Sequence, residues 1–348
     1  MFFSIIVPCF NVEHYLSRCI ESILSQDIQT DDSFSIILVN DGSSDHTLDV
    51  IAEYEEKYPD LIVAIDLGQN SGQSVARNVA MQYADGDFLF FLDSDDWIEK
   101  NTFSHFLSLL EQYPGTDIIS CDSDRPSNLL DTTPSPKCSI SDYILATDFG
   151  RQEYLCQHRL EIGIGGKLIR RTLFTDNDLT FPEGLKYEDN YVCWILFEKA
   201  KRILHTNQIL YHWYVNPNST TSAKKNYFDR LPIQTMLLQK MKSEPEYEKD
   251  KDIIEYNFWE KAFVETMYAM GLNLGSTQPE ILSEIREMVF KQVPDILDNY
   301  YINNPTKINH FLAIEAFITL FKKDTIDRDG VERCWNEFVS TYKSLASQ

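Results

Sequence analysis

Long hydrophobic runs are missing from this 348-residue chain: no apolar stretch approaches the roughly 20 residues that a membrane-spanning helix needs. Basic residues are also few, since 31 Lys and Arg stand against 54 Asp and Glu, for a formal net charge of −23. This balance argues against a broad electrostatic grip on nucleic acid or anionic lipid. We therefore expect a cytoplasmic protein that binds no nucleic acid and contacts the inner face of a membrane at most peripherally.

Paired cysteines are lacking too. The number of cysteines is odd and no two have CxxC spacing, which argues against a zinc site or a disulfide framework and favours a reducing compartment. The first eight residues carry no basic segment, so we expect a first strand there and not a signal peptide. The seven cysteines are Cys9, Cys19, Cys121, Cys138, Cys156, Cys193 and Cys334.

The first third of the chain alternates apolar runs with amphipathic segments. This alternation predicts βαβ units and a doubly wound parallel sheet, whose ligands bind beyond the carboxyl ends of the strands. We expect strands over residues 2–8, 34–39, 61–65 and 88–92, and helices over residues 12–25, 45–58 and 71–84.

The remaining pattern is mixed. Apolar faces such as Ile254, Phe258, Ala262, Phe263, Met267 and Met270, and that of residues 311–321, fit packing in a helical bundle; a cofactor or membrane surface is the alternative. We expect a strand over 116–121, a loop over 122–137, helices over 167–174 and 187–200, one or two strands over 202–215, and helices beyond about 225.

Three carboxylates follow the expected strand at 88–92: Asp93, Asp95 and Asp96. Like charges this close repel one another, and a hard divalent cation such as Mg²⁺ or Mn²⁺ would relieve the repulsion. The Asp93-Ser94-Asp95 spacing can serve one cation, or divide between a metal and a sugar hydroxyl. It also resembles the start of a haloacid-dehalogenase-type phosphatase, although those enzymes place the motif on their first strand and favour Thr or Val at the position of Trp97.

Two further segments lie beyond expected strands. In residues 40–45, Asp41 could accept hydrogen bonds from a base or ribose, or the segment could be an ordinary turn and helix cap. In residues 70–78, Gly72 allows close backbone approach, and Arg77 could reach phosphate oxygens or pair with a nearby carboxylate.

Taken in order, residues 4–11, 39–45, 72–78 and 91–97 closely resemble the family-two glycosyltransferases of the GT-A fold, of the bacterial surface-polysaccharide or adhesin-glycosylation type. The strong resemblance covers residues 2–115. A looser resemblance continues through residues 166–169, 179–185, 187–190 and 211–220, and residues 225–348 match no family that we can name.

The resemblance implies an α/β GT-A fold with a doubly wound, mostly parallel sheet and a C-terminal helical region. Residues 1–115 would bind the nucleotide sugar, 116–222 would hold the acceptor and the catalytic base, and 223–348 would form the helical region. The implied activity is metal-assisted inverting transfer from a UDP-sugar to a hydroxyl of a saccharide acceptor on lipid or protein, with Mn²⁺ or Mg²⁺. The helical region could form a homodimer.

The resemblance also implies roles for single residues. Pro8 and Phe10 would flank the base, Asp41 would bind uracil or ribose, Asp93 would touch the ribose, and Asp95 would hold the metal. Asp189 of the Glu188-Asp189 pair is the expected general base; a charged pair in the first turn of a helix is the alternative. The full donor-binding set is Pro8, Phe10, Asn11, Asp41, Gly72, Arg77, Asp93, Ser94, Lys167 and His212, and the metal set is Asp95, Asp93 and His212.

Several positions depart from the family pattern. Asn40 stands where relatives often have Asp, Gly165-Gly166 leaves room that could admit an acceptor, and Asn216 replaces a frequent Arg. His212 could then face the diphosphate or metal, or be structural, with Lys167, Arg170 and Arg171 as other phosphate partners. The Gln-x-x-Arg-Trp signature of processive synthases is absent, so we expect one sugar per encounter. A non-catalytic partner subunit and, less favoured, a phosphatase are the alternative functions.

Overall fold

The structure is a computed structural model that describes residues 2–28, 34–124, 139–145, 163–215, 230–267, 278–305 and 314–346. The chain divides into two compact units. The first comprises residues 1–147, 161–184 and 188–220, and the second comprises residues 148–160, 185–187 and 221–348. The predicted division at residues 115 and 222 stays a prediction, and each unit is described by itself.

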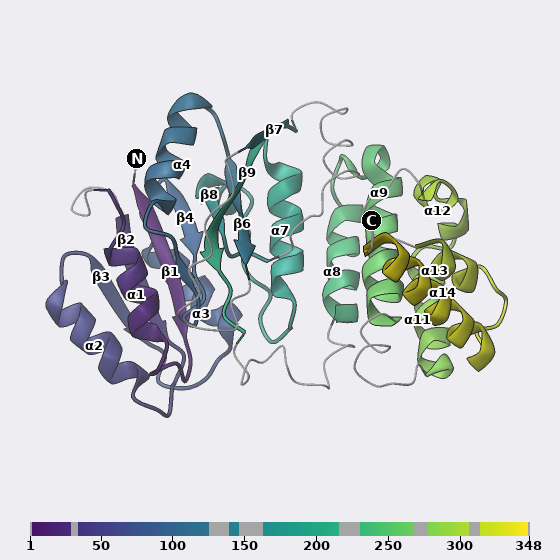
Figure 1. The fold of residues 1–348 in the computed structure, drawn as a ribbon, viewed down its shortest axis with the longest axis horizontal. Coiled ribbons are helices and arrows are strands. Elements are labelled where there is room, and N and C mark those ends of the chain that lie inside the picture. Colours follow the sequence, from purple (N-terminus) through teal and green to yellow (C-terminus); the bar gives the residue numbers. More distant parts are fainter. Residues whose placement is uncertain are drawn as a thin grey trace. The chain divides into compact units, whose positions relative to one another are not determined.

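Strands of the first unit join in one mixed sheet (Figure 1). Among the described residues the order is β3-β2-β1-β4-β8-β6-β9-β5, and β7 pairs with β9. The strands are β1 (Phe3–Cys9), β2 (Phe34–Asn40), β3 (Ile62–Asp66), β4 (Phe88–Phe91), β5 (Trp97–Ile98), β6 (Ile118–Asp124), β7 (Ile140–Ile144), β8 (Lys167–Arg170) and β9 (Arg202–His212).

The four strands β3, β2, β1 and β4 are mutually parallel, as the alternation of strands and helices predicts. Every residue of β1 and β4 is buried, because a parallel strand is covered on both faces. All four strands therefore end at one edge of the sheet, and the predicted binding segments follow those ends.

Helices cover both faces of the sheet. The apolar core on one face gathers Phe3, Ile5 and Val7 of β1 with buried side chains of α1, α2 and α4. Because the crossover from β3 to β4 runs opposite to those before it, α3 covers the other face. The helices of this unit are α1 (Leu16–Leu24), α2 (Thr47–Lys57), α3 (Gln73–Tyr83), α4 (Thr102–Gln112), α6 (Thr172–Thr175) and α7 (Glu188–Lys199).

The prediction of one helix over residues 167–174 is wrong, because residues 167–170 form the strand β8 and only residues 172–174 are helical. Leu168 and Ile169 are fully buried in β8, which pairs antiparallel with β4 on one side and with β6 on the other. Hydrogen bonding on both edges favours the extended form of this short apolar segment over a helix, and only α6 is helical. Residues 122–124 likewise extend β6, and the rest of the expected loop lies outside the described residues.

Beyond residue 225 the described elements of the second unit are helices, as predicted. Ile254, Phe258, Ala262, Phe263 and Met267 are all at most 4% exposed, so this apolar face is used for packing; Met270 lies outside the described residues. No described helix is long and apolar enough to cross a membrane. The elements are α8 (Arg230–Lys242), α9 (Tyr247–Trp259), η3 (Glu260–Val264), α11 (Pro279–Gln292), η4 (Ile296–Asp298), α12 (Tyr300–Asn303), α13 (Ile314–Phe321) and α14 (Arg328–Ala346).

Candidate functional site

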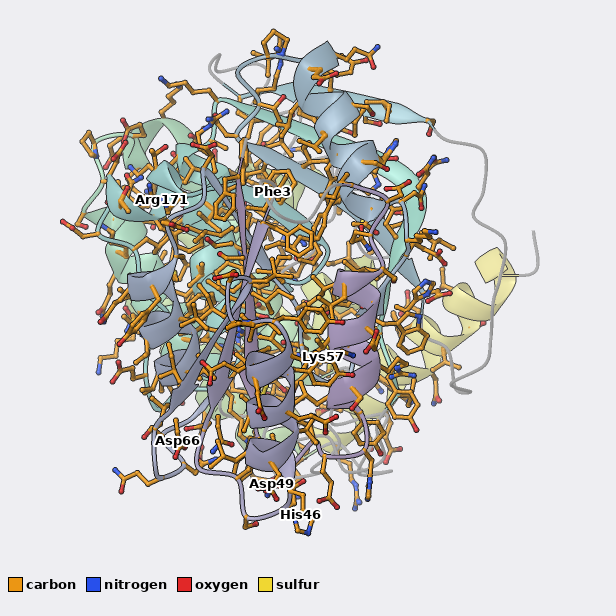
Figure 2. All side chains as sticks on the ribbon, turned by 90° about the vertical axis from the view of Figure 1, so that its left-hand side faces the viewer. Phe3, His46, Asp49, Lys57, Asp66 and Arg171 are labelled. Carbon is orange, nitrogen blue, oxygen red and sulfur yellow. The ribbon has the colours of Figure 1, made fainter. Side chains whose placement is uncertain are left out.

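The candidate site lies at the carboxyl edge of the parallel strands. Figure 2 shows Asp66, at the end of β3, and His46 and Asp49, at the start of α2, toward one end of the sheet, and Phe3, at the start of β1, toward the other. Side-chain hydrogen bonds join the segment after β1 to the segment after β2, the segment after β2 to the residues before α3, and the segment after β4 to α1 and α3.

The loop after β1 is fastened to the loop after β2. Asn11 has a φ of 53°, its amide N–H donates to the Ser43 hydroxyl (3.1 Å), and its side-chain oxygen accepts from the Ser44 N–H (2.8 Å). Pro8 is buried within β1, whereas the neighbouring Phe10 is 44% exposed. Asn11 therefore fixes the loop that presents the Phe10 ring.

Asp41 lies at the end of β2 and is 3% exposed. Its two carboxylate oxygens accept from the N–H groups of Ser71 (2.6 Å) and Gly72 (2.9 Å), just before α3. Gly72 has a φ of 94°, a conformation that favours glycine. The turn-and-cap interpretation therefore describes the Asp41 contacts, and contact with a base or ribose stays a prediction. Asn40 donates to the Asp66 carboxylate (2.8 Å).

Asp93, at the end of β4, is 30% exposed at its side chain. Its Oδ1 accepts from Arg77 Nη2 (2.9 Å) and from Gln73 Nε2 (3.1 Å). Ser94 is buried, and Asp95 is half-buried, with its backbone carbonyl accepting from Arg18 Nη2 (2.7 Å). Asp93 and Asp95 thus have different neighbours, which fits a division of work between them.

Asp96 lies well before α4, which begins only at Thr102. It is fully buried, and its carboxyl oxygens accept from the Tyr211 hydroxyl (2.6 Å) and the Tyr214 N–H (2.8 Å). Burial, reinforced by the charges of Asp93 and Asp95, raises the pKa of Asp96 to about 9. Asp96 therefore anchors Tyr211 and the backbone of Tyr214 behind the site, in surroundings that favour its protonated form.

Arg77, on α3, gathers three carboxylates. Its Nη1 donates to Glu188 Oε1 (2.8 Å) and to Asp189 Oδ1 (2.9 Å), while Nη2 donates to Asp93. The Arg77 side chain is 1% exposed. The structure thus realises the predicted alternative in which Arg77 pairs with carboxylates, and its contact with phosphate stays a prediction.

Glu188 and Asp189 begin α7, and their carboxylates differ in exposure. The Glu188 side chain is 11% exposed and that of Asp189 is 25% exposed. Burial raises the pKa of Glu188 to about 7, and the charge of Asp189 adds to the shift. Burial also raises the pKa of Asp189, although the charge of Arg77 opposes it. Both groups can therefore exchange protons closer to neutral pH than ordinary carboxylates.

The segment before β8 completes the surroundings of Asp189. The Ile164 N–H donates to Asp189 Oδ2 (3.3 Å), and Lys167, which is 2% exposed, donates from Nζ to the Gly163 carbonyl (2.6 Å). The room expected at Gly165 is taken by Tyr211, because a Cβ there would lie 3.0 Å from the Tyr211 ring and hydroxyl. Gly165 therefore lets Tyr211 pack closely against the backbone, and the placement of an acceptor beside Gly165-Gly166 stays a prediction.

Register in the sheet separates the other predicted phosphate partners. Because β8 is antiparallel to β4, Arg170 pairs with Phe88 at the amino end of β4, and the backbone N–H of Arg171 bonds to Asp87. These residues lie at the end of β4 opposite to Asp93, so they are wrong as phosphate partners. Lys167, at the other end of β8, lies on the side of the site.

His212, at the end of β9, uses both ring nitrogens. Nδ1 lies 2.7 Å from Asp124 Oδ1, Nε2 lies 2.9 Å from Glu99 Oε1, and the ring stacks on Trp97. Ligation of a metal or diphosphate by His212 would require one of these hydrogen bonds to break, and it stays a prediction. Asn216 lies outside the described residues.

Some residues with contacts in this site were missed as site residues. The Tyr211 hydroxyl donates to Asp96 and accepts from the Asp93 N–H (3.3 Å). Asn78 binds the backbone of Phe181 through both the nitrogen and the oxygen of its side-chain amide (2.8 Å each). Asn78 stands in the motif that carries the family resemblance, so its motif position was the available signal. Nothing in the local sequence pairs Tyr211 with Asp96.

A hard cation would find oxygen ligands here. Among the described residues no group of three or more His, Cys, Asp or Glu is arranged as a metal site. However, Mg²⁺ typically takes only one or two protein carboxylates and completes its shell with phosphate oxygens and water. Asp93 and Asp95, on one turn, supply carboxylates of that kind, and they fit a cation brought by a diphosphate.

Comparison with known proteins gives a consistent result. The model of glycosyl transferase family 2 matches residues 4–183. The chain is 30% identical over 220 residues to the uncharacterized glycosyltransferase EpsJ of Bacillus subtilis, covering 63% of this chain and 62% of EpsJ. It is 27% identical over 220 residues to the poly(ribitol-phosphate) beta-N-acetylglucosaminyltransferase TarS of Staphylococcus aureus, covering 61% of this chain and 35% of TarS. The matched region is thus less than two thirds of either relative.

Solved structures share the fold. The crystal structure of S. aureus TarS 1–349 in complex with UDP-GlcNAc superposes with a TM-score of 0.72 at 22% identity, over 97% of this chain and 92% of that chain. The mannosyltransferase PcManGT from Pyrobaculum calidifontis, in complex with GDP-Man and Mn²⁺, gives a TM-score of 0.55 at 12% identity, over 97% and 86% of the two chains. The predicted GT-A fold with a C-terminal helical region is confirmed.

Proposed function

The chain belongs to glycosyl transferase family 2, and from this premise we propose that it moves a sugar from a UDP-sugar to a hydroxyl group of a saccharide acceptor. The nucleotide is inferred from TarS, whose structure holds UDP-GlcNAc. UDP-GlcNAc is therefore the first donor to test. The transfer would be a single displacement with inversion at the anomeric carbon, which needs a base and a stabilised leaving group but no enzyme nucleophile.

One observation carries this proposal. Asp93, at the end of β4, and the Glu188-Asp189 pair, at the start of α7, lie within 2.9 Å of the same Arg77 guanidinium. The residues assigned to the donor and those assigned to deprotonation of the acceptor therefore occupy one site, although 94 residues or more separate them along the chain.

Asp189 is the proposed general base. A base must reach the acceptor hydroxyl at about 3 Å, and Asp189 is the more exposed member of the pair. Glu188 is more buried and shares Nη1 of Arg77 with Asp189. We assign Glu188 a supporting part in the same proton transfer.

The donor would lie along the carboxyl edge. The exposed Phe10 ring, with Pro8 behind it in the strand, would face the uracil base of the donor. Asp41 and Asp93 would face the nucleoside. Asp95, with Asp93, would hold the divalent cation, which stabilises the charge on the departing diphosphate when it is bound. Gly72 and Ser94 would let the diphosphate approach the backbone, and Lys167 would contribute positive charge.

The acceptor and the setting follow from the family and are part of the proposal. The acceptor would be a saccharide carried by a lipid or a surface protein, and the reaction would take place in the cytoplasm, with at most peripheral membrane contact. The phosphatase alternative gains no support, because the family match includes the Asp93-Ser94-Asp95 segment.

The test is donor turnover with and without metal. Purified protein is incubated with a panel of UDP-sugars in Mn²⁺ or in a chelator, and release of UDP is measured. We expect turnover of at least one donor in Mn²⁺ and its loss in chelator. Asp95→Ala should abolish it, while Asp60→Ala, an exposed carboxylate at the opposite end of β3, should not. Binding and turnover of no UDP-sugar, with activity only beside a co-purified partner, would favour the non-catalytic subunit instead.

A further inference from the structure

We propose that Arg77 is a positioning residue that ties Asp93 to the Glu188-Asp189 pair, and that it does not bind the diphosphate. This inference rests on the proposed function and assigns a separate task to one residue of the same site. It replaces the expectation that Arg77 lies against phosphate.

Carboxylates already occupy the outer nitrogens of the Arg77 guanidinium. Nη1 already donates to Glu188 and Asp189, and Nη2 donates to Asp93, all at 2.8–2.9 Å. The remaining donor atom, Nε, is buried without a hydrogen-bond partner among the described residues. With the side chain 1% exposed, a phosphate could reach Arg77 only by displacing a carboxylate from it.

The second argument is the charge of the cluster. Three carboxylates surround one guanidinium, and burial with their mutual repulsion raises the pKa values of Glu188 and Asp189. The positive charge of Arg77 is therefore needed where it is, because an uncompensated buried carboxylate is costly. A diphosphate brought to the same guanidinium would add negative charge to a cluster that already has an excess.

The third argument is the packing beneath Arg77. The guanidinium lies over the Phe181 ring, 5.1 Å from its centroid. Phe181 is held in turn by Asn78, whose amide donates to the Phe181 carbonyl and accepts from the Phe181 N–H. Neighbouring residues of α3 thus fix both the guanidinium and the ring that supports it.

The planar shape of the Arg77 guanidinium matters for the reaction because it fixes where the bound carboxylates lie. The guanidinium is a rigid plane, so its two outer nitrogens set the separation between the donor-side and acceptor-side carboxylates. Displacement of a catalytic group by about 1 Å can cost on the order of 100-fold in rate while substrate binding persists. Loss of the fork should therefore lower kcat and leave the affinity for the nucleotide unchanged.

The test is Arg77→Lys, which keeps the charge and loses the fork. Arg170→Lys is the matched control, because Arg170 also binds a carboxylate, that of Asp117, but at the far end of β4. Calorimetry measures the affinities for UDP and for uridine, and turnover of the active UDP-sugar is followed from pH 5 to 9. We expect UDP and uridine affinities within about twofold of wild type, a kcat at least tenfold lower, and an acid limb of the kcat profile moved to higher pH, because Asp189 loses part of its stabilisation.

In Arg77→Lys, a tenfold loss of UDP affinity with unchanged uridine affinity would overturn the inference, because it would place Arg77 on the phosphates. A normal kcat in this variant would also overturn it. If wild-type protein binds UDP and turns over a donor, such results count against Arg77 alone and leave the proposed function standing. Absence of UDP binding by wild type would overturn both.

Glu188→Gln keeps the inference testable if the lysine variant fails to fold. This change is nearly isosteric and removes one of the charges that compete for Arg77. We expect the ratio of UDP to uridine affinity to stay within about twofold of wild type. A tenfold rise in that ratio would show that the released guanidinium serves the diphosphate, and would overturn the inference.

Discussion

Asp93 and Asp96 lie three residues apart after β4, and their carboxyl groups differ in exposure and in hydrogen-bond partners. Asp93 is 30% exposed and binds the Arg77 guanidinium. Asp96 is fully buried and is held by a tyrosine hydroxyl and a backbone N–H, and its pKa is raised to about 9.

The difference shows two environments that a fold can give to a carboxyl group. At Asp93 the guanidinium of Arg77 supplies an opposite charge to the carboxylate. At Asp96 burial favours the protonated form of the carboxyl group. Only the first leaves an anion able to meet a cation or a sugar. The cluster that looks uniform in the sequence therefore combines a partly exposed carboxylate paired with a cation, Asp93, with a fully buried carboxyl group, Asp96.

Removal of the guanidinium should give the largest effect on stability. Arg77→Met would leave three carboxylates without their cation, and we expect a loss of about 3–5 kcal/mol in the free energy of unfolding at pH 8. The loss should shrink at pH 5, because Glu188 and Asp189 take up protons there. Urea unfolding at both pH values measures it, with Arg170→Met as the more exposed control. A loss below about 1 kcal/mol at pH 8 would mean that the cluster does not need Arg77.

Changes at Asp96 should depend on shape more than on charge. Asp96→Ala leaves the Tyr211 hydroxyl and the Tyr214 N–H without their acceptor, so we expect a loss of about 2–3 kcal/mol. Asp96→Asn keeps an acceptor oxygen and removes no charge at neutral pH, so its loss should stay below about 1 kcal/mol. Thermal and urea unfolding compare the two variants. Equal losses would contradict the view that Asp96 is neutral.

The pH dependence of stability should separate Glu188 from the other groups. Its folded pKa, about 7, lies above its ordinary value of 4.5, so the native state binds more protons than the unfolded chain between these values. The contribution of Glu188 to stability should therefore fall as pH rises from about 4.5 to 7 and then level off. Glu188→Gln should flatten this fall by about 1–3 kcal/mol, measured by urea unfolding in chelator from pH 5 to 8. Parallel curves for the two proteins would exclude the shift.

The smallest effect is expected at Gly165. A methyl group there would press on Tyr211, which Asp96 holds in place, so Gly165→Ala should cost about 1 kcal/mol. Gly163→Ala is the control in the same segment, because a Cβ there meets nothing within 4 Å. Their melting temperatures should differ, and equal values would mean that Tyr211 gives way freely.

The local pattern predicted the parallel half of the sheet closely. Continuous apolar runs marked β1, β2 and β4, and each predicted binding segment follows the end of a strand. The Glu188-Asp189 pair was also expected at the start of a helix, where α7 begins. These features depend on periodicity and on residues near in sequence, so the chain reveals them directly.

Long-range pairing was not predictable in the same way. The first half of the helix expected over residues 167–174 is the strand β8, because hydrogen bonds to β4 and β6 override local preference. The same register places Arg170 far from Asp93. Likewise, the partners of Arg77 stayed open in the sequence, since Glu188 and Asp189 follow it by more than 100 residues. Only the folded sheet brings them together.

The most direct test of the proposed mechanism is Asp189→Asn, assayed for UDP affinity and for transfer in the same preparation. We expect UDP affinity within about threefold of wild type and a transfer rate lower by roughly 100-fold or more, because the amide cannot accept the proton of the acceptor hydroxyl. Asp60→Asn should match wild type in both. A normal transfer rate in the Asp189 variant would contradict the account.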